Sequence, residues 1–282
     1  MSNKLSVIQS ATTAVSTEVR SYLSHGALQL PANYSVENAL KSAMLSLPST
    51  KNIQNCTQDS IKSSLLSMAV QGLNPDKKQC YFIAYGETLA CQRSYLGDIA
   101  VAKQVDPEIE EIYAAAVYQG DEFSYEIKRG KIVSIHHSQK IENKNKPITA
   151  AYATVVYRDG SEISTVMTID QIQQSWKQSS SKPFADNGQL KPDSVHAKFP
   201  EEMAKKTVTH KACKPIIGSS SDATLFGKFA RETFDDVQVD AEIQENANQE
   251  YIDTECVEIP EGVDPETGEY TEPGDKGEVE PF

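Results

Sequence analysis

A succession of short strand-like segments between residues 79 and 168 constrains the fold of this chain most strongly. Aromatic and β-branched residues dominate these segments, and turns at Gly86-Glu87, Gly120, Gly130 and Asp159-Gly160 separate them. Because tight turns join antiparallel neighbours, we expect a strongly twisted antiparallel sheet whose successive strands form a meander. The first two segments, QCYFIAYG and TLACQR, are predicted to form a hairpin, and SYLGDIAVAKQV a short helix after it.

Helical patterns lie on both sides of these strands. Apolar residues at helical spacing predict helices over residues 5–23, 57–71, 169–177, 199–214 and 221–232. A further helix is expected to begin after Ser35 as its N-cap and to end at Pro48. We therefore predict an α+β fold, in which a twisted antiparallel sheet packs with helices and is flanked by N- and C-terminal helices. Trp176, the only tryptophan, is expected in helix or subunit packing.

Charge divides the chain into two unequal parts. The net charge is -13, but residues 235–282 hold 17 Asp and Glu against one Lys, which gives -16. Residues 1–234 keep 26 basic and 23 acidic side chains, so the body carries +3. The C-terminal part is rich in Glu, Pro and Gly and has no helical or strand period, so we expect a disordered acidic tail.

Several classes of protein receive no support from the sequence. No apolar run approaches the roughly 18 to 20 residues of a membrane helix, and the N-terminus has no hydrophobic signal region, so a cytoplasmic protein is expected. The five cysteines have no CxxC spacing, so we expect reduced, mostly buried thiols and no metal site. A GxxxxGK[ST] loop for ATP is missing, and carboxylates such as Asp98 and Asp106 fit solvent faces better than a nuclease site. The prediction is therefore a non-enzymatic protein without a cofactor.

Three stretches resemble a known family. The segments GLNPDKKQCYFIAYG, LACQRSYLGDIAVAK and EEMAKKTVTHKACK are similar to the core signatures of the RecT family of phage single-strand annealing proteins, and the likeness covers roughly residues 30 to 232. The resemblance implies ATP-independent binding and annealing of single-stranded DNA by ring or helical homo-oligomers. It also implies a phage exonuclease and the host single-strand binding protein as partners. Leu96 and the pair His210-Lys211 depart from the family pattern, which often has basic residues there.

With this resemblance the chain divides into three expected parts. Residues 1–30 would be a helical oligomerisation segment, residues 31–234 a DNA-binding and annealing core, and residues 235–282 the tail. The tail has three readings: a solubilising segment, a dock for a partner protein, or a DNA mimic that competes for a basic groove. The alternative for the whole chain is a self-associating scaffold whose acidic tail recruits partner proteins.

An annealing protein must hold one strand by its phosphates and leave the bases available to a second strand. In the helix over 199–214, the row Lys206, His210 and Lys214 should lie opposite an apolar row and meet phosphate, although a solvated basic face is the plain alternative. The other candidates are a basic hairpin tip near Phe123 and Tyr125, a second basic segment, and the CQR strand end. The full predicted set is Gln92, Arg93, Tyr95, Lys103, Lys128, Arg129, Lys131, Lys144, Lys146, Lys198, Lys205, Lys206, His210, Lys211 and Lys214.

Overall fold

A computed structural model describes residues 2–178, 182–219 and 225–232, which all belong to one compact unit, Met1–Asn248. The predicted acidic tail and Cys256 lie outside the described residues, as do residues 221–224 of the last predicted helix. Among the helices that are described, none combines the length and apolar character needed to cross a membrane.

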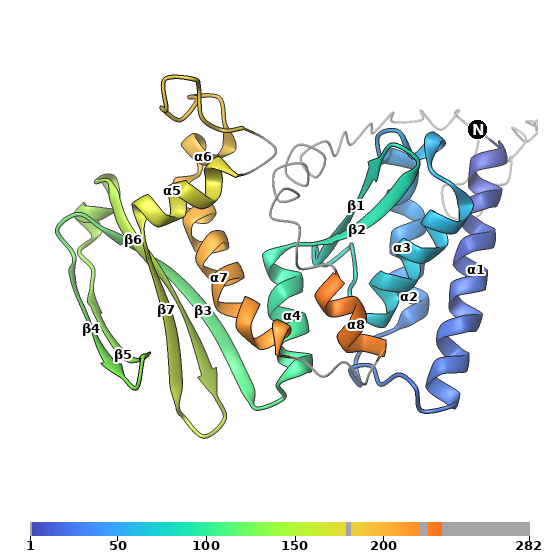
Figure 1. Cartoon of the computed structure of the whole chain (residues 1–282), viewed down its shortest axis with the longest axis horizontal. Coiled ribbons are helices and arrows are strands. Elements are labelled where there is room, and N and C mark those ends of the chain that lie inside the picture. The colour runs from blue at the N-terminus through green and yellow to red at the C-terminus, as the bar shows by residue number, and fades with distance from the viewer. Residues whose placement is uncertain (1, 179–181, 220–224, 233–282) are drawn as a thin grey trace, which may run out of the picture. The chain divides into compact units, whose positions relative to one another are not determined.

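The N-terminal part consists of helices packed against a hairpin (Figure 1). Its helices are α1 (Ser2–Ser24), α2 (Val36–Ser46) and α3 (Gln58–Val70), with the short 3-10 helices η1 (Leu47–Ser49) and η2 (Ile53–Asn55) between the last two. Ser35 and Thr57 cap α2 and α3 by accepting backbone N–H bonds, as expected of such residues at a helix start. Strands β1 (Cys80–Tyr85) and β2 (Thr88–Arg93) form the predicted hairpin around Gly86, whose φ is 60°. The hairpin is a separate two-stranded sheet.

A five-stranded antiparallel sheet forms the second part. Its strands are β3 (Ile109–Tyr118), β4 (Glu122–Lys128), β5 (Lys131–Ser138), β6 (Ile148–Tyr157) and β7 (Glu162–Thr168), in the order β3-β6-β7-β5-β4. The α+β fold with antiparallel strands is thus confirmed. The predicted meander is only partly correct, because β3 pairs with β6 and not with β4, the next strand along the chain. This order lets the apolar strand β6 bond on both sides and leaves the largely exposed β4 at an edge.

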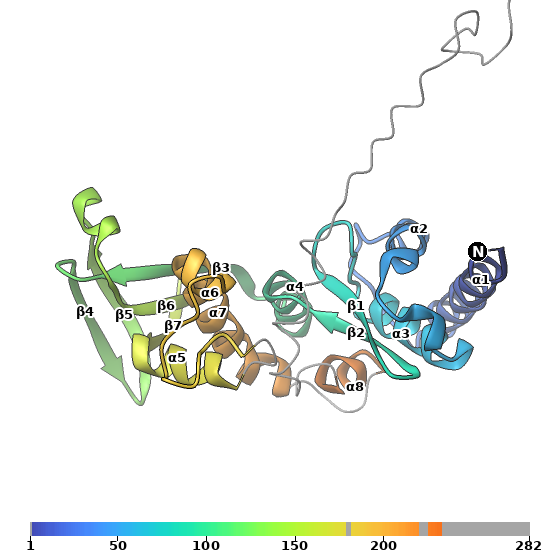
Figure 2. The same cartoon turned by 90° about the horizontal axis from the view of Figure 1, so that it is seen from above.

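Two C-terminal helices, α5 (Ile169–Lys177) and α7 (Pro200–Gly218), cover one face of this sheet, and Figure 2 shows them on the same side of it. The short helix α6 (Val195–Lys198) packs against α7. Helix α4 (Tyr95–Val105) packs on α7, and α8 (Leu225–Glu232) contacts α3 and α7. Because α7 lies between the sheet and α4, it is buried on several sides. It also continues past the predicted end at Lys214, through Pro215 to Gly218.

Two predictions about single side chains hold in this core. Trp176 is 3% exposed and its Nε1 donates to Thr207 Oγ1 at 2.9 Å, which joins α5 to α7. Cys80, Cys91 and Cys213 are buried free thiols, and Cys56 is a half-buried one.

Candidate nucleic-acid interface

An open depression brings together three of the predicted DNA-binding cations. It lies where the 3-10 helix η3 (Ile141–Asn145) meets the junction of α6 and α7, and its volume is about 630 Å³. Lys144, Lys146 and Lys198 are exposed side chains of its lining, and Phe199, which is 58% exposed, stands beside Lys198. The remaining lining is formed by Tyr118, Asn145, Pro147, Ile148, Ile169, Gln173, Trp176, Leu190, Pro200, Glu201 and Glu202.

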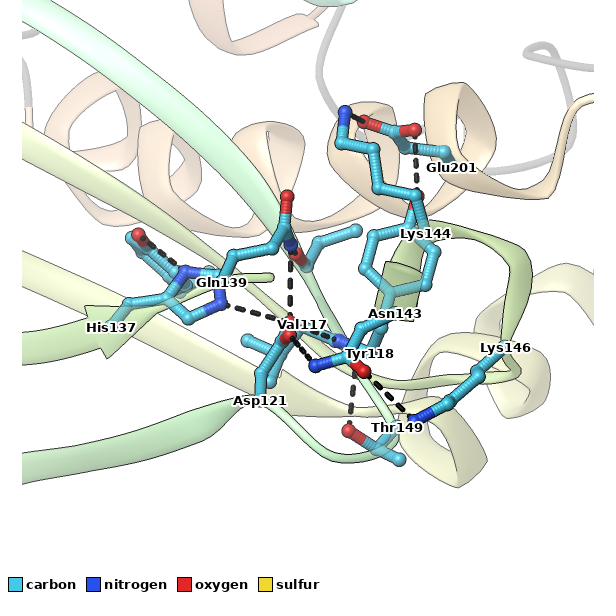
Figure 3. A network of polar contacts seen from close by, with 12 residues as sticks. Val117, Tyr118, Asp121, His137, Gln139, Asn143, Lys144, Lys146, Thr149 and Glu201 are labelled. Atoms are coloured by element: carbon cyan, nitrogen blue, oxygen red, sulfur yellow. Dashed lines mark hydrogen bonds and ion pairs between the residues drawn. The ribbon is translucent and has the colours of Figure 1, made fainter. Parts of the chain in front are cut away.

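A buried carboxylate fixes the η3 segment against the sheet (Figure 3). The Asp121 side chain is fully inaccessible, and its Oδ2 accepts bonds from the Tyr118 backbone N–H at 2.8 Å and from Gln139 at 3.1 Å, with His137 Nε2 also at 3.1 Å. Its Oδ1 accepts from Asn143 Nδ2 at 2.8 Å. Burial by itself would raise the pKa of the Asp121 carboxyl, but these bonds outweigh it and hold that pKa well below its usual value. Asp121 therefore stays ionised and keeps its donors in place.

Asn143 connects Asp121 to Lys146 by hydrogen bonds. It is 3% exposed, and while its Nδ2 donates to Asp121, its Oδ1 accepts a bond from Lys146 Nζ at 2.8 Å. Lys144 follows Asn143 directly in η3. Lys144 and Lys146 are thus carried by a 3-10 helix and its C-cap, which are hydrogen-bonded to the sheet through Asn143 and Asp121.

Two glutamates line the depression near the start of α7. Glu201 Oε2 accepts a 2.7 Å bond from Tyr118 OH, and Glu201 Oε1 lies 3.4 Å from Lys205 Nζ and 4.0 Å from Lys144 Nζ. The Tyr118 bond and the neighbouring lysine charges lower the pKa of Glu201. Lys205 also contacts Glu202 Oε1 at 2.6 Å. Lys205 is therefore occupied by two carboxylates in this conformation and is not an open phosphate ligand.

The expected basic row of α7 needs correction. Lys206 is only 7% exposed, because α7 is covered on that side, whereas the apolar row opposite it is buried as predicted. His210 Nδ1 lies 2.8 Å from Asp98 Oδ2 on α4. Lys214 is exposed, so only the C-terminal end of the row faces solvent, and Lys211, which lies outside the row, is exposed as well.

The CQR strand end also differs from its expected role. Gln92 is 6% exposed, and the Arg93 side chain is 2% exposed and donates to Asp98, to Gln71 and to the Ala230 carbonyl. Asp98 supplies a counter-charge one turn into α4, so the guanidinium is paired inside the protein instead of lying on its surface. Tyr95 is half-buried at the start of α4.

The β4–β5 hairpin presents its predicted basic tip. Lys128, Arg129 and Lys131 are exposed, and Arg129 and Gly130 have φ of 53° and 78°, the left-handed pair that a tight two-residue turn requires. The aromatic neighbour Phe123 is not at the tip. It stacks on Tyr152 of β6, with ring centroids 5.6 Å apart.

Arg158 and Phe199 are exposed residues that the sequence did not single out. Arg158, which precedes the Asp159-Gly160 turn, lines a second depression of about 800 Å³ together with the predicted Lys103. Phe199 is the other, and the signal was a large aromatic residue directly before Pro-Glu-Glu, where a helix start favours a small polar residue.

Exposed lysines beside an exposed aromatic ring are side-chain types that contact phosphates and bases in proteins that bind a single nucleic acid strand. The model of the RecT family matches residues 37–248, more than half of the 282 residues, and the chain belongs to the RecT family. No curated protein matches the chain. RecT proteins are single-strand annealing proteins of recombination, generally not enzymes, and membership indicates binding of single-stranded DNA and oligomerisation.

Proposed function

We propose that this protein binds single-stranded DNA and anneals it to a complementary strand without ATP during phage recombination, as a ring or helical oligomer that holds the duplex intermediate. The observation that carries the proposal is the convergence of Lys144, Lys146 and Lys198 around the exposed ring of Phe199. Family membership supports the same activity.

The chemistry of annealing fits this surface. Lysine ammonium groups attract phosphates whatever the sequence, and an aromatic face accepts any base, so strand capture needs no sequence reading. Binding energy comes from released counterions and stacking, so no nucleotide hydrolysis is required. Arg158 with Lys103, the β4–β5 tip, and Lys211 with Lys214 are further proposed contacts along the strand.

The wider setting is proposed on the same basis. Residues 1–30 would support oligomerisation and residues 31–234 would form the annealing core, inside the cytoplasm of the host. A phage exonuclease that produces single strands and the host single-strand binding protein would be the partners. The acidic tail, residues 235–282, would solubilise the assembly, bind such a partner or compete with DNA.

The test is binding and annealing of labelled oligonucleotides without nucleotide, as a function of salt. The wild-type chain should bind with steep salt dependence and accelerate duplex formation. Replacing Lys144, Lys146 and Lys198 by glutamine should lower the salt exponent by about two per bound subunit, since each phosphate contact on a single strand contributes about 0.7. A matched variant replaces the exposed Lys41, Lys51 and Lys77 and should change the exponent much less.

Two results would contradict the proposal. A chain that binds no oligonucleotide at any salt concentration would instead fit the scaffold whose tail recruits proteins. ATP turnover or strand cleavage that disappears with a single substitution would indicate an enzyme.

A further inference from the structure

We propose that the depression beside Phe199 is a subsite for one unstacked nucleobase, whose ring lies on the Phe199 ring while the adjoining phosphates contact Lys144, Lys146 and Lys198. The inference rests on the proposed DNA-binding function and deepens it, because it names the part of the strand that each side chain contacts. The ligand proposed for this depression is a nucleobase and not a phosphate or a duplex.

The first argument is the residue type at a helix start. Helices α2 to α6 all begin after a Ser or Thr whose side chain accepts a backbone N–H bond. Helix α7 begins after Phe199, which makes no such side-chain bond. A phenylalanine there forgoes the cap that serine or threonine provides, and its ring remains 58% exposed. Departures from local rules of this kind are expected at functional sites.

The second argument is the shape and lining of the depression. Its volume, about 630 Å³, lies within the range of small-ligand sites, roughly 300 to 1,000 Å³. Pro147, Ile148 and Leu190 give it apolar walls beside Phe199. A flat aromatic base fits such a lining, and stacking tolerates every base because each has a π face.

The third argument is the distribution of charge. Glu201 and Glu202 line the same depression, so a phosphate inside it would face two carboxylates. Lys144, Lys146 and Lys198 are exposed and can meet phosphates on either side of an inserted base. Three lysines and two glutamates thus share one lining whose formal charge is close to neutral, which suits an uncharged base, while the exposed lysines remain available to the phosphates of the adjoining chain.

The fourth argument is preorganisation. The bonds from Asp121 through Asn143 to Lys146 hold one side of the site in place before any ligand arrives. Trp176 lines the depression from α5, where its bond to Thr207 fixes it. Little side-chain order then has to be gained on binding, which favours affinity.

The experiment uses the single tryptophan of the full-length chain as a reporter. Trp176 fluorescence is followed while oligo-dT, or an abasic oligonucleotide of the same length, is added. Oligo-dT should change the fluorescence, and the abasic strand, which has the same phosphates without bases, should change it much less. Anisotropy of labelled versions of both oligonucleotides measures binding in parallel.

Phe199 variants separate base contact from phosphate contact. Phe199→Ser should weaken oligo-dT binding about five-fold or more, in line with the loss of one stacked base, and leave abasic binding and the salt exponent unchanged. Its midpoint of thermal unfolding should stay the same or rise, because serine suits a helix start. Phe199→Tyr should retain binding, and Tyr113→Ala, which removes an exposed ring on β3, should have little effect.

The outcomes distinguish this inference from the proposed function. If the wild-type chain binds neither oligonucleotide, the DNA-binding function itself fails. If oligo-dT binds and the three-lysine variant weakens it, but Phe199→Ser does not, the function stands and the base subsite is wrong. Equal losses for oligo-dT and abasic DNA in Phe199→Ser would also overturn the subsite.

Discussion

Asp98 holds two basic side chains from different elements at once. Its Oδ1 lies 3.0 Å from Arg93 Nε and its Oδ2 2.8 Å from His210 Nδ1, and the Arg93 side chain is almost completely buried. Removing one partner of a buried ion pair leaves an uncompensated charge, which costs about 3–5 kcal/mol. Asp98→Asn should therefore lower the free energy of unfolding by about 3 kcal/mol in urea denaturation. Asp76→Asn, at an exposed position, is the control and should be nearly neutral; equal effects would mean that the buried pair is not stabilising.

The burial of His196 predicts that the folded protein loses stability in acid. Its ring is 4% exposed and packs edge-on against Trp176, and burial, with a smaller effect from the Lys206 charge, lowers its pKa to about 4. The unfolded chain binds the proton at a pKa of about 6.5. Folding thus favours neutral His196, and stability falls as the pH drops from about 6.5 to 4, by on the order of 2 kcal/mol.

The measurement is the thermal midpoint of the wild type and of His196→Gln at several values of pH in that window. The wild-type midpoint should fall more steeply than that of the variant. His136→Gln, at an exposed position of β5, should follow the wild type. Parallel curves for wild type and His196→Gln would show that the buried imidazole is not the titrating group.

At the scale of elements, α7 carries lysines with two expected roles, one in stability and one in DNA binding. Lys206 is buried between packed elements, whereas Lys211 is exposed on the same helix. Lys206→Ala should lower the free energy of unfolding by about 1–2 kcal/mol through lost packing of its stem. Lys211→Ala should keep stability within about 0.5 kcal/mol and weaken single-strand binding modestly. Denaturation and anisotropy measure the two effects, and a stability loss at Lys211 as large as at Lys206 would contradict the assignment.

Local signals in the sequence predicted the elements well. Ser35 and Thr57 mark the helix starts where they are found, and Gly86 and Gly130 lie in the expected turns, because caps and tight turns depend on a few neighbouring residues. The pairing of strands that are distant in the sequence was harder to predict. That β3 pairs with β6 depends on which strands bury their faces under α7, and no local pattern encodes this choice.

The site was only partly predictable for a related reason. Lys144, Lys146 and Lys198 were named from their charge. The position of the segment that carries Lys144 and Lys146 depends on Asp121 and Asn143, which resemble ordinary turn residues in the sequence. Arg93 and Lys206 have the same residue type as surface DNA contacts. Their burial follows from tertiary packing of α4 and α7, which helical periodicity within one element does not reveal.

At the scale of the whole molecule, the boundary of the acidic tail matters for experiment. The charge shift predicted a division at residue 235, whereas the family match extends to residue 248. Deletion from residue 235 would therefore remove part of the matched region. Deletion of residues 249–282 removes 12 acidic residues and one lysine, a change of 11 charges, and leaves the matched region whole.

This deletion should tighten single-strand binding at low salt, because the tail repels phosphate or occupies the cations of a body that carries only +3 over residues 1–234. The difference should shrink as salt rises, since the screening length falls from about 10 Å at 0.1 M to about 3 Å at 1 M. Anisotropy titrations of both chains across this range provide the measurement. The matched control keeps the tail at full length but changes its 12 acids to the corresponding amides, and it should bind as tightly as the deletion. If the deletion and the control bind like the wild type at every salt concentration, the tail does not act on DNA through charge, and a partner protein becomes its expected ligand.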